Sequence, residues 1–519
     1  MASIDEGGKS PIGKWGIILS GIFLAVSWRI SYLSGFSDWT IAAWGGSYIL
    51  HWDPDGMYLG AGISLGDIPH IPSDGPHPGL PLIWLIYSLS RTFSLIAGPW
   101  TEAPTNSLFV AKNIFWIAFL SKCFITIIHL LSFFALYRLA LVFTRPAEAK
   151  IAVLAYGTTM IVFHSINKIS PEPFVVLFSL LGLLCCYEFI RDPHRPRGYL
   201  FLGLSALNGA CAILSKFMIS APLFFFLPAY ILSHPHVKPR LKWIASTLFI
   251  AFSLAFLFLL GWKIDWEEFF RFWIQYAPGG SRMAEGSWFH AWHRDWTPGL
   301  EFQYHQFFWG ELPFLILSLW GLRSYWKFFP EKRRQLAWLL LLALLLTPAV
   351  LYRAAPHYGF LHFALGSIFF GYGVCRLARW ASPKYLPAGK GRSFLLAAIF
   401  TLFIHSFGIG SFLLVREEDI GRYQKNWRPY FQALEQIRYG ERIGMIKEEC
   451  RLTPDRVITL QLPASAPLAL AFQRLFQEID PARPDRDDGA SPEPKVILRC
   501  RRDGVAFLDR TSKDAFQHE

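Results

Sequence analysis

Apolar residues along this 519-residue chain gather in long runs that polar segments interrupt. Eight of these runs carry almost no charge: 15–26, 114–136, 173–187, 199–214, 243–262, 335–351, 359–375 and 394–415. A helix of roughly 20 apolar residues spans the hydrocarbon layer of a bilayer. The pattern therefore predicts an all-α polytopic membrane protein. The run after Met1–Lys14 is expected to stay as the first membrane helix, because no small-x-small cleavage site follows it.

The charges of the connecting segments predict how the helices are oriented. Basic residues cluster at Lys9/Lys14, 138–150, 191–197, 238–242, 323–334 and 376–392, and such clusters mark cytoplasmic loops. The alternating segments are poor in Lys and Arg: 35–80, 164–172, 215–222 and 351–358. The run 81–98 breaks the alternation, so we interpret it as a helix that packs in the bundle or dips in without crossing. The alternation then predicts about eleven crossings, with the N-terminus inside and the C-terminal tail outside.

Composition and charge divide the chain into a membrane domain, 1–415, and a C-terminal soluble domain, 416–519. The chain is 53% hydrophobic and 17% charged, against about 25% charged in soluble proteins. Its net charge is +12, yet the tail contains 18 basic and 18 acidic residues. The excess positive charge thus belongs to the membrane domain, which argues against nucleic-acid binding. The tail is expected to be a small extracytoplasmic α/β module, with strands at "RVITLQL" and "KVILRC" and helices near 423–438 and 465–478.

Two outer loops are expected to be large. The first, 35–107, begins with the acidic segment 35–80, which has five Asp and no basic residue. The second, 263–305, is crowded with Trp, Phe and Tyr, as in the belt of aromatic residues at a membrane surface, or as in a wall that guides a lipid tail. In the tail, Cys450 and Cys500 would be able to form a disulfide in an oxidising compartment, and sequence leaves this open.

Several polar side chains stand close to the predicted outer ends of the apolar runs. They are Asp53, Asp55, His77, Glu172, Lys216, Arg353 and His357. Ionisable groups at membrane depth are costly and are functional candidates by default. The cations suit a phosphate, and the two aspartates suit a metal ion or a proton. Purely structural roles are the alternative to these functions. Asp55, beside a glycine, would suit a turn, and Glu172 would suit a helix cap. Lys216 would suit a span end from which its side chain extends to the membrane surface.

Four segments, in order, carry a resemblance to a known family. They are "DPDGMYLGAGISLGDIP" with "DGPHPGLPLIW", "ISPEPFVVLFSLLGLL", "GYLFLGLSALNGACAILSK" and "YRAAPHYGFLHFAL". Together they resemble the C-type membrane glycosyltransferases, most closely the superfamily of protein O-mannosyltransferases and lipid A aminoarabinose transferases. The matching positions are Asp55, Tyr58, Gly66, the His77–Leu80 element, Glu172, Ser215–Lys216, Arg353 and Tyr358. Many relatives have Asp-Glu where this chain has Pro54-Asp55, which leaves the base open between Asp53 and Asp55.

The resemblance implies an inverting transfer of a sugar from a polyprenyl-phosphate donor on the outer face of the membrane. Asp55, with Asp53 as the alternative or the helper, would be the general base. The substrate-binding residues would be Tyr58, His77, Glu172, Lys216, Arg353, His357 and Tyr358. No cofactor is required, and a divalent metal at Asp53 and Asp55 is optional. The acceptor would be a lipid, a glycan or a protein, reached among membrane lipids, and a bacterial inner membrane fits best.

Two other classes of function compete with a glycosyltransferase. A membrane transporter or lipid flippase would line a pathway with its charged groups and often shows paired repeats. This chain has no visible repeat, and its candidate charges lie at outer span ends. A non-catalytic assembly protein is the third reading, and it predicts that Asp55 tolerates replacement.

Overall fold

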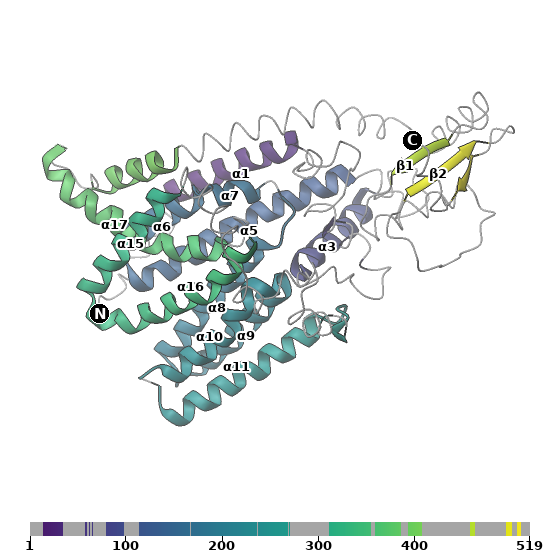
Figure 1. Cartoon of the computed structure of the whole chain (residues 1–519). Helices are drawn as coiled ribbons and strands as arrows, with labels where there is room; N and C mark the ends of the chain where they lie inside the picture. Colours follow the sequence, from purple (N-terminus) through teal and green to yellow (C-terminus); the bar gives the residue numbers. More distant parts are fainter. Residues whose placement is uncertain are drawn as a thin grey trace.

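The structure is a computed structural model in which helices dominate. It describes residues 14–34, 58, 59, 62, 65, 79–97, 114–166, 168–235, 237–267, 269, 311–353, 359–385, 393–406, 457–461, 495–500 and 506–509. Figure 1 shows long helices running side by side in one bundle, with α1 (Lys14–Ser34) and α11 (Pro239–Leu260) at opposite edges of the view.

The other helices of the bundle follow in chain order. They are α3 (Leu80–Ala97), α5 (Ile114–Phe143), α6 (Pro146–Gly157), α7 (Met160–Ile166), α8 (Glu172–Arg191), α9 (Pro196–Ser215), α10 (Phe217–Ser233), α15 (Leu312–Phe328), the short 3-10 helix η3 (Pro330–Lys332), α16 (Arg333–Arg353), α17 (Phe360–Tyr385) and a helix over Ser393–Ser406. Each of the eight predicted apolar runs overlaps one of these helices. Besides α3, which was predicted separately over 81–98, the eight runs did not include the helical regions α6–α7, α10 and α15.

Five of the described helices are long and apolar enough to cross a membrane. They cover Trp116–Phe143, Glu172–Arg191, Pro196–Ser215, Pro239–Leu260 and Phe360–Ala381. Three shorter apolar helices cover Leu80–Ile96, Ser220–Ser233 and Ser393–Ser406. The mostly helical membrane fold is therefore confirmed, whereas the count of about eleven crossings stays a prediction.

Hydrogen bonds join several of the predicted cytoplasmic segments at one end of the bundle, which we call the basic end because basic clusters lie there. The Tyr325 hydroxyl donates to the Phe143 carbonyl oxygen at 2.8 Å, and the Lys332 ammonium donates to the Val142 carbonyl. Arg379, from the second half of α17, pairs with the buried Glu148 near the start of α6 at 2.6 Å. Three of the basic clusters thus contribute contacts at this end, and the guanidinium of Arg334 also donates to the carbonyl of Ser233, the last residue of α10. Burial lowers the pKa of Lys332 below its ordinary value, and the nearby Glu331 partly offsets this.

Close helix packing builds the larger core around α15 and α17. A Cβ added at Gly321 would lie only 2.0 Å from the Phe369 carbonyl oxygen, so α15 reaches the backbone of α17 there. A Cβ at Gly371 would lie 2.5 Å from the Glu148 carbonyl oxygen, which brings α17 equally close to α6. Small residues permit such approaches in membrane helices, where van der Waals packing holds helices together.

A second, smaller core occupies the opposite end, which we call the outer end. Its buried members include residues of the first outer loop (Tyr58, Leu59, Leu65), of α3, of the first half of α5 and of the C-terminal part of α9. The helix predicted over 81–98 is thus present as α3, and its Leu82, Ile83 and Ile86 are buried in this core. Segments far apart in the sequence are thereby fixed to one end of the bundle, and the candidate residues depend on this packing.

The C-terminal part shows three antiparallel strands in the order β1-β2-β3. They are β1 (Val457–Gln461), β2 (Lys495–Cys500) and β3 (Ala506–Asp509), and Val457 pairs with Arg499. The first two coincide with the predicted strands, and the third was not predicted. The helices expected at 423–438 and 465–478, the second outer loop beyond Phe269 and Cys450 lie outside the described residues.

Candidate active site

The structure describes the side chains of three of the nine predicted site residues. Tyr58, Glu172 and Lys216 are all buried. Arg353 is the last residue of α16. The remaining five lie outside the described residues: Asp53, Asp55, His77, His357 and Tyr358.

Glu172 is the first residue of α8, and the sequence explains why the helix begins there. Pro171 and Pro173 flank it, and proline suits the first turn of a helix, where its missing N–H needs no partner. A carboxylate in the first turn also faces the positive end of the helix dipole. Glu172 is thus the first residue inside α8, whereas the N-cap position belongs to Pro171 and carries no side-chain cap hydrogen bond, so the capping role predicted for Glu172 is not what the structure shows.

Lys216 occupies the single-residue break between α9 and α10. Its backbone is extended, with φ −160° and ψ 98°, so the helix of α9 stops and α10 starts afresh at Phe217. The Ser220 hydroxyl lies 2.8 Å from the Ala212 carbonyl oxygen and 2.9 Å from that of Lys216. These contacts engage carbonyl groups that a helix end otherwise leaves unpaired. The break thus directs a lysine into the protein at the outer end.

Glu172 and Lys216 form a buried ion pair. The Lys216 ammonium donates to Oε1 of Glu172, and both side chains are 5% exposed. The two residues are 44 positions apart, and α8 and α9 bring them together because the two helices pack along their length. An ammonium and a carboxylate removed from water stabilise each other only as a pair, so each fixes the position of the other.

The ion pair is joined to the first outer loop through the backbone of α9. The Gly79 N–H donates to the Ser215 carbonyl oxygen at 3.2 Å, directly beside Lys216. Gly79 has φ +56°, a conformation that side chains with a Cβ rarely adopt, and a Cβ there would lie 2.1 Å from Cε1 of Tyr58. Three predicted site residues, Tyr58, Glu172 and Lys216, are therefore connected through Gly79 and Ser215.

Replacing Gly79 with alanine is expected to disturb the outer end selectively. An alanine in this left-handed backbone conformation destabilises the folded state by about 1–2 kcal/mol. Its new methyl group also displaces the Tyr58 ring. We expect faster proteolysis of the first outer loop, with thermal unfolding of the bundle lowered only slightly. Gly203→Ala is the matched control, because its Cβ would meet no atom within 4 Å. Equal proteolysis of the two variants would contradict the prediction.

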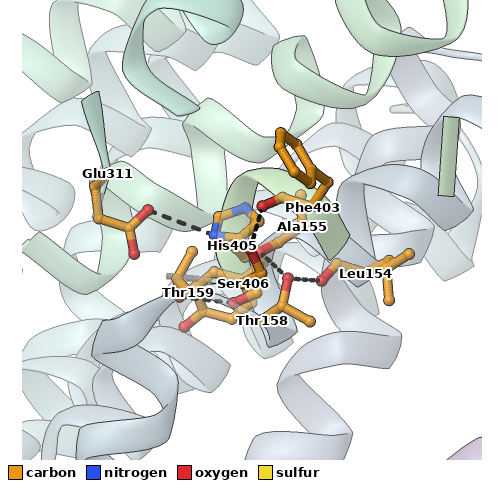
Figure 2. Close-up of polar contacts among 9 residues, drawn as sticks. Leu154, Ala155, Thr158, Thr159, Glu311, Phe403, His405 and Ser406 are labelled. Atoms are coloured by element: carbon orange, nitrogen blue, oxygen red, sulfur yellow. Dashed lines mark hydrogen bonds and ion pairs between the residues drawn. The ribbon is translucent and has the colours of Figure 1, made fainter. Parts of the chain in front are cut away.

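A second buried acidic contact lies beside Phe314 and Phe370 of the larger core, and sequence reasoning did not find it. Nδ1 of His405 is 3.7 Å from Oε2 of Glu311, and both side chains are buried. Figure 2 shows the imidazole turned toward this carboxylate, with Thr158 and Thr159 in the same close-up. The two hydroxyls are engaged locally, since Thr158 donates to Leu154 and Thr159 to Tyr156. The signal for this contact was a His in the middle of the apolar run 394–415, without any indication of its partner.

The described residues contain no cluster of three His, Cys, Asp or Glu side chains that would hold a metal ion. The two aspartates predicted as optional ligands lie outside this part of the chain, so their fit to a metal stays a prediction. The five described cysteines in the apolar helices are free thiols, as expected of packing residues: Cys123, Cys185, Cys186, Cys211 and Cys375.

The fold and its apolar helices define an integral membrane protein. No protein-family model matches the chain, and no curated protein sequence matches it. Its structure is similar to that of ArnT from Cupriavidus metallidurans bound to undecaprenyl phosphate, with 12% identity and a TM-score of 0.42 over 83% of this chain and 80% of that one.

Two further similar structures come from Archaeoglobus fulgidus. One is the oligosaccharyltransferase AglB in complex with an inhibitory peptide and a dolichol-phosphate, with 13% identity and a TM-score of 0.41 over 84% of this chain. The other is an oligosaccharyltransferase tethered to an acceptor peptide, with 13% identity and a TM-score of 0.42 over 86% of this chain. This chain spans 58% of each archaeal protein. These similarities extend over most of this chain, and they identify no residue of a site.

Proposed function

We propose that this protein is a membrane glycosyltransferase that moves a sugar from a polyprenyl-phosphate donor to an acceptor. The observation that carries the proposal is the link from Tyr58 through Gly79 and Ser215 to the Lys216–Glu172 pair. Four segments named from sequence supply site residues, and three of these segments meet at the outer end through these contacts. Asp55 stands three positions before Tyr58 in the chain, and Asp53 five positions before it.

The reaction balances with a single carboxylate as general base. The acceptor hydroxyl oxygen forms a bond to the anomeric carbon of the sugar, on the face opposite to the phosphate. The bond between that carbon and the phosphate oxygen breaks, and its electron pair stays on the phosphate. Asp55 takes the hydroxyl proton, and Asp53 supports it. An aspartate with its ordinary pKa of about 3.9 is ionised at neutral pH and available for this role.

The other site residues bind and position the substrates. Arg353, His357 and His77 supply positive or hydrogen-bonding groups for the phosphate, whose negative charge grows as it leaves, so cations there favour the transition state. Tyr358 and Tyr58 line the sugar side. The Glu172–Lys216 pair holds the first outer loop in place, and Lys216 meets the phosphate as one half of a neutral pair.

The active site faces away from the basic end of the bundle. By the positive-inside tendency the basic end is cytoplasmic, which supports chemistry on the outer side of the membrane. The membrane proposed is a bacterial inner membrane. A lipid, a glycan or a protein serves as the acceptor. The C-terminal strands belong to a domain on the same outer side.

The test is donor consumption by the purified protein in liposomes. The liposomes contain a polyprenyl-phosphate sugar labelled in the sugar, together with a membrane extract as the source of acceptor. We expect label to leave the donor lipid and polyprenyl phosphate to accumulate in equal amount. Liposomes with heat-unfolded protein are the control.

Two results would overturn the proposal. Movement of intact donor across the bilayer without cleavage would favour the flippase. Neither cleavage nor movement, with folded protein and several donor sugars, would favour an assembly protein.

A further inference from the structure

We propose that the protein binds an anionic membrane phospholipid where α15 and α17 meet at the basic end of the bundle. We call this surface the α15–α17 seam. It lies at the end of the bundle opposite to the candidate active site, so the inference does not depend on the proposed function. The side chains that form it are Ile316, Leu319, Trp320, Arg323 and Lys327 of α15, with Arg376 and Trp380 of α17.

One face of α15 changes from apolar to cationic toward the basic end. Its stripe consists of four exposed side chains at intervals of four, three and four residues: Ile316, Trp320, Arg323 and Lys327. Residues three and four apart share a helix face. Leu319, which is 55% exposed, widens the apolar part of the stripe. Trp320 and Lys327 are separated by about 10 Å along the helix axis. The stripe therefore matches an amphiphile, with an acyl chain along its apolar part and a charged head group at its cationic end.

The helix α17 supplies the other side of the seam. The two helices are in close contact there, because a Cβ added at Gly373 would lie 3.3 Å from Cε3 of Trp320. Arg376 and Trp380 follow Gly373 by three and seven residues, so they share its face of α17. The Trp380 side chain is 65% exposed, as expected of an aromatic residue at a membrane surface. Each helix thus contributes a tryptophan and at least one cation.

Two cations of the seam lie near the same aromatic ring. The guanidinium carbon of Arg376 is 4.1 Å from the ring centroid of Phe328, and the ammonium nitrogen of Lys327 is 6.0 Å from it. An aromatic ring attracts a cation but carries no net charge, so these contacts position the two side chains without neutralising them. Two positive groups from different helices suit a phosphate, whose oxygens accept charge-assisted hydrogen bonds.

The positive charge of the seam is not balanced within the part of the chain that the structure describes. No carboxylate of that part forms an ion pair with Arg323, Lys327 or Arg376. The cluster 323–334 has five basic residues and one acidic residue, Glu331. Basic surfaces between membrane helices on the cytoplasmic side bind anionic lipid head groups. A phospholipid also covers the apolar part of the stripe, which an acidic peptide leaves exposed to the membrane.

The experiment measures lipid retention by the purified full-length protein in native mass spectrometry. Phosphatidylglycerol is compared with phosphatidylcholine of the same acyl chains, so that only the head-group charge differs. Glycerol phosphate and polyglutamate are added as competitors in parallel series. The main variant is Arg323→Gln with Lys327→Gln, which removes two exposed charges and leaves the contact between Arg376 and Phe328 in place.

The matched control removes two charges from another basic cluster. It combines Arg191→Gln with Arg195→Gln, and both of these arginines are exposed. Each already has an acidic partner, since Arg191 pairs with Glu188 and Arg195 with Asp192. The control therefore changes the net charge of the protein by the same amount as the main variant without altering the seam.

We expect the wild type to retain phosphatidylglycerol at least about fivefold better than phosphatidylcholine, because each basic residue strengthens binding to an anionic lipid. The main variant should lose most of this preference, and the control should keep it. Arg376→Gln should also reduce it. In lipid-free detergent the main variant should unfold at the wild-type temperature, because the replaced side chains are exposed. Added phosphatidylglycerol should then raise the unfolding temperature of the wild type more than that of the variant.

Four results would overturn the inference. Equal retention of the two lipids by the wild type would show that the protein has no anionic lipid site. An equal loss of preference in the control would show that net charge, and not the seam, sets the preference. Displacement of phosphatidylglycerol by glycerol phosphate would indicate a site for the free anion. Displacement by polyglutamate would indicate an acidic protein partner.

Discussion

Asp55→Asn is expected to reduce sugar transfer by about 10²–10⁴-fold, the usual contribution of a general base. Asparagine has the shape of aspartate and cannot accept the acceptor proton, so donor binding should remain. The measurement is release of polyprenyl phosphate from labelled donor at matched amounts of folded protein. Wild-type transfer should also fall as the pH drops toward about 4, where an ordinary aspartate becomes protonated.

Two companion variants make this result specific to Asp55. Asp67→Asn makes the same change within the same acidic segment and is expected to transfer at the wild-type rate. Asp53→Asn is expected to lose less activity than Asp55→Asn. A full loss at Asp53 with normal transfer at Asp55 would move the base to Asp53. Normal transfer by both variants would remove the carboxylate mechanism.

The helices were predictable because membrane-spanning segments have a strong local signal. Each of the eight apolar runs overlaps a helix, since roughly 20 apolar residues have few other stable arrangements in a bilayer. The apolar runs read from the sequence did not include the helices α10 and α15. α10 contains two prolines, Pro222 and Pro228, and membrane helices tolerate proline when neighbouring groups engage the freed carbonyls. In addition, the Ser246 hydroxyl of α11 donates to the Pro228 carbonyl oxygen at 3.2 Å, which joins the second half of α10 to α11.

The candidate site was predictable as a set of residues but not as a set of contacts. The position of Glu172 between two prolines and of Lys216 at a span end marked both residues. Their pairing depends on how α8 and α9 pack, and no pattern along the chain encodes a partner 44 residues away. His405 was passed over for a related reason: it is a polar residue within an apolar run, and only the fold shows that it is buried.

The Glu172–Lys216 pair is expected to contribute strongly to the stability of the outer end. Lys216→Met leaves the Glu172 carboxylate buried beside an apolar side chain, and breaking a buried pair in this way costs about 3–5 kcal/mol. Glu172→Gln should cost a similar amount for the same reason. The measurement is denaturant or thermal unfolding of the purified protein in detergent.

A double-mutant cycle separates the pair from the packing of the two side chains. The Glu172→Gln, Lys216→Met double variant should be more stable than the sum of the single changes predicts, because neither charge is then left alone. The matched control is Asp192→Asn, which removes the exposed 2.8 Å contact with Arg195 in the turn between the same two helices. That exposed pair is expected to contribute under about 1 kcal/mol. Additive effects at Glu172 and Lys216 would show that their contact does not hold α8 against α9, and the Gly79–Ser215 hydrogen bond would then be the main tie to the first outer loop.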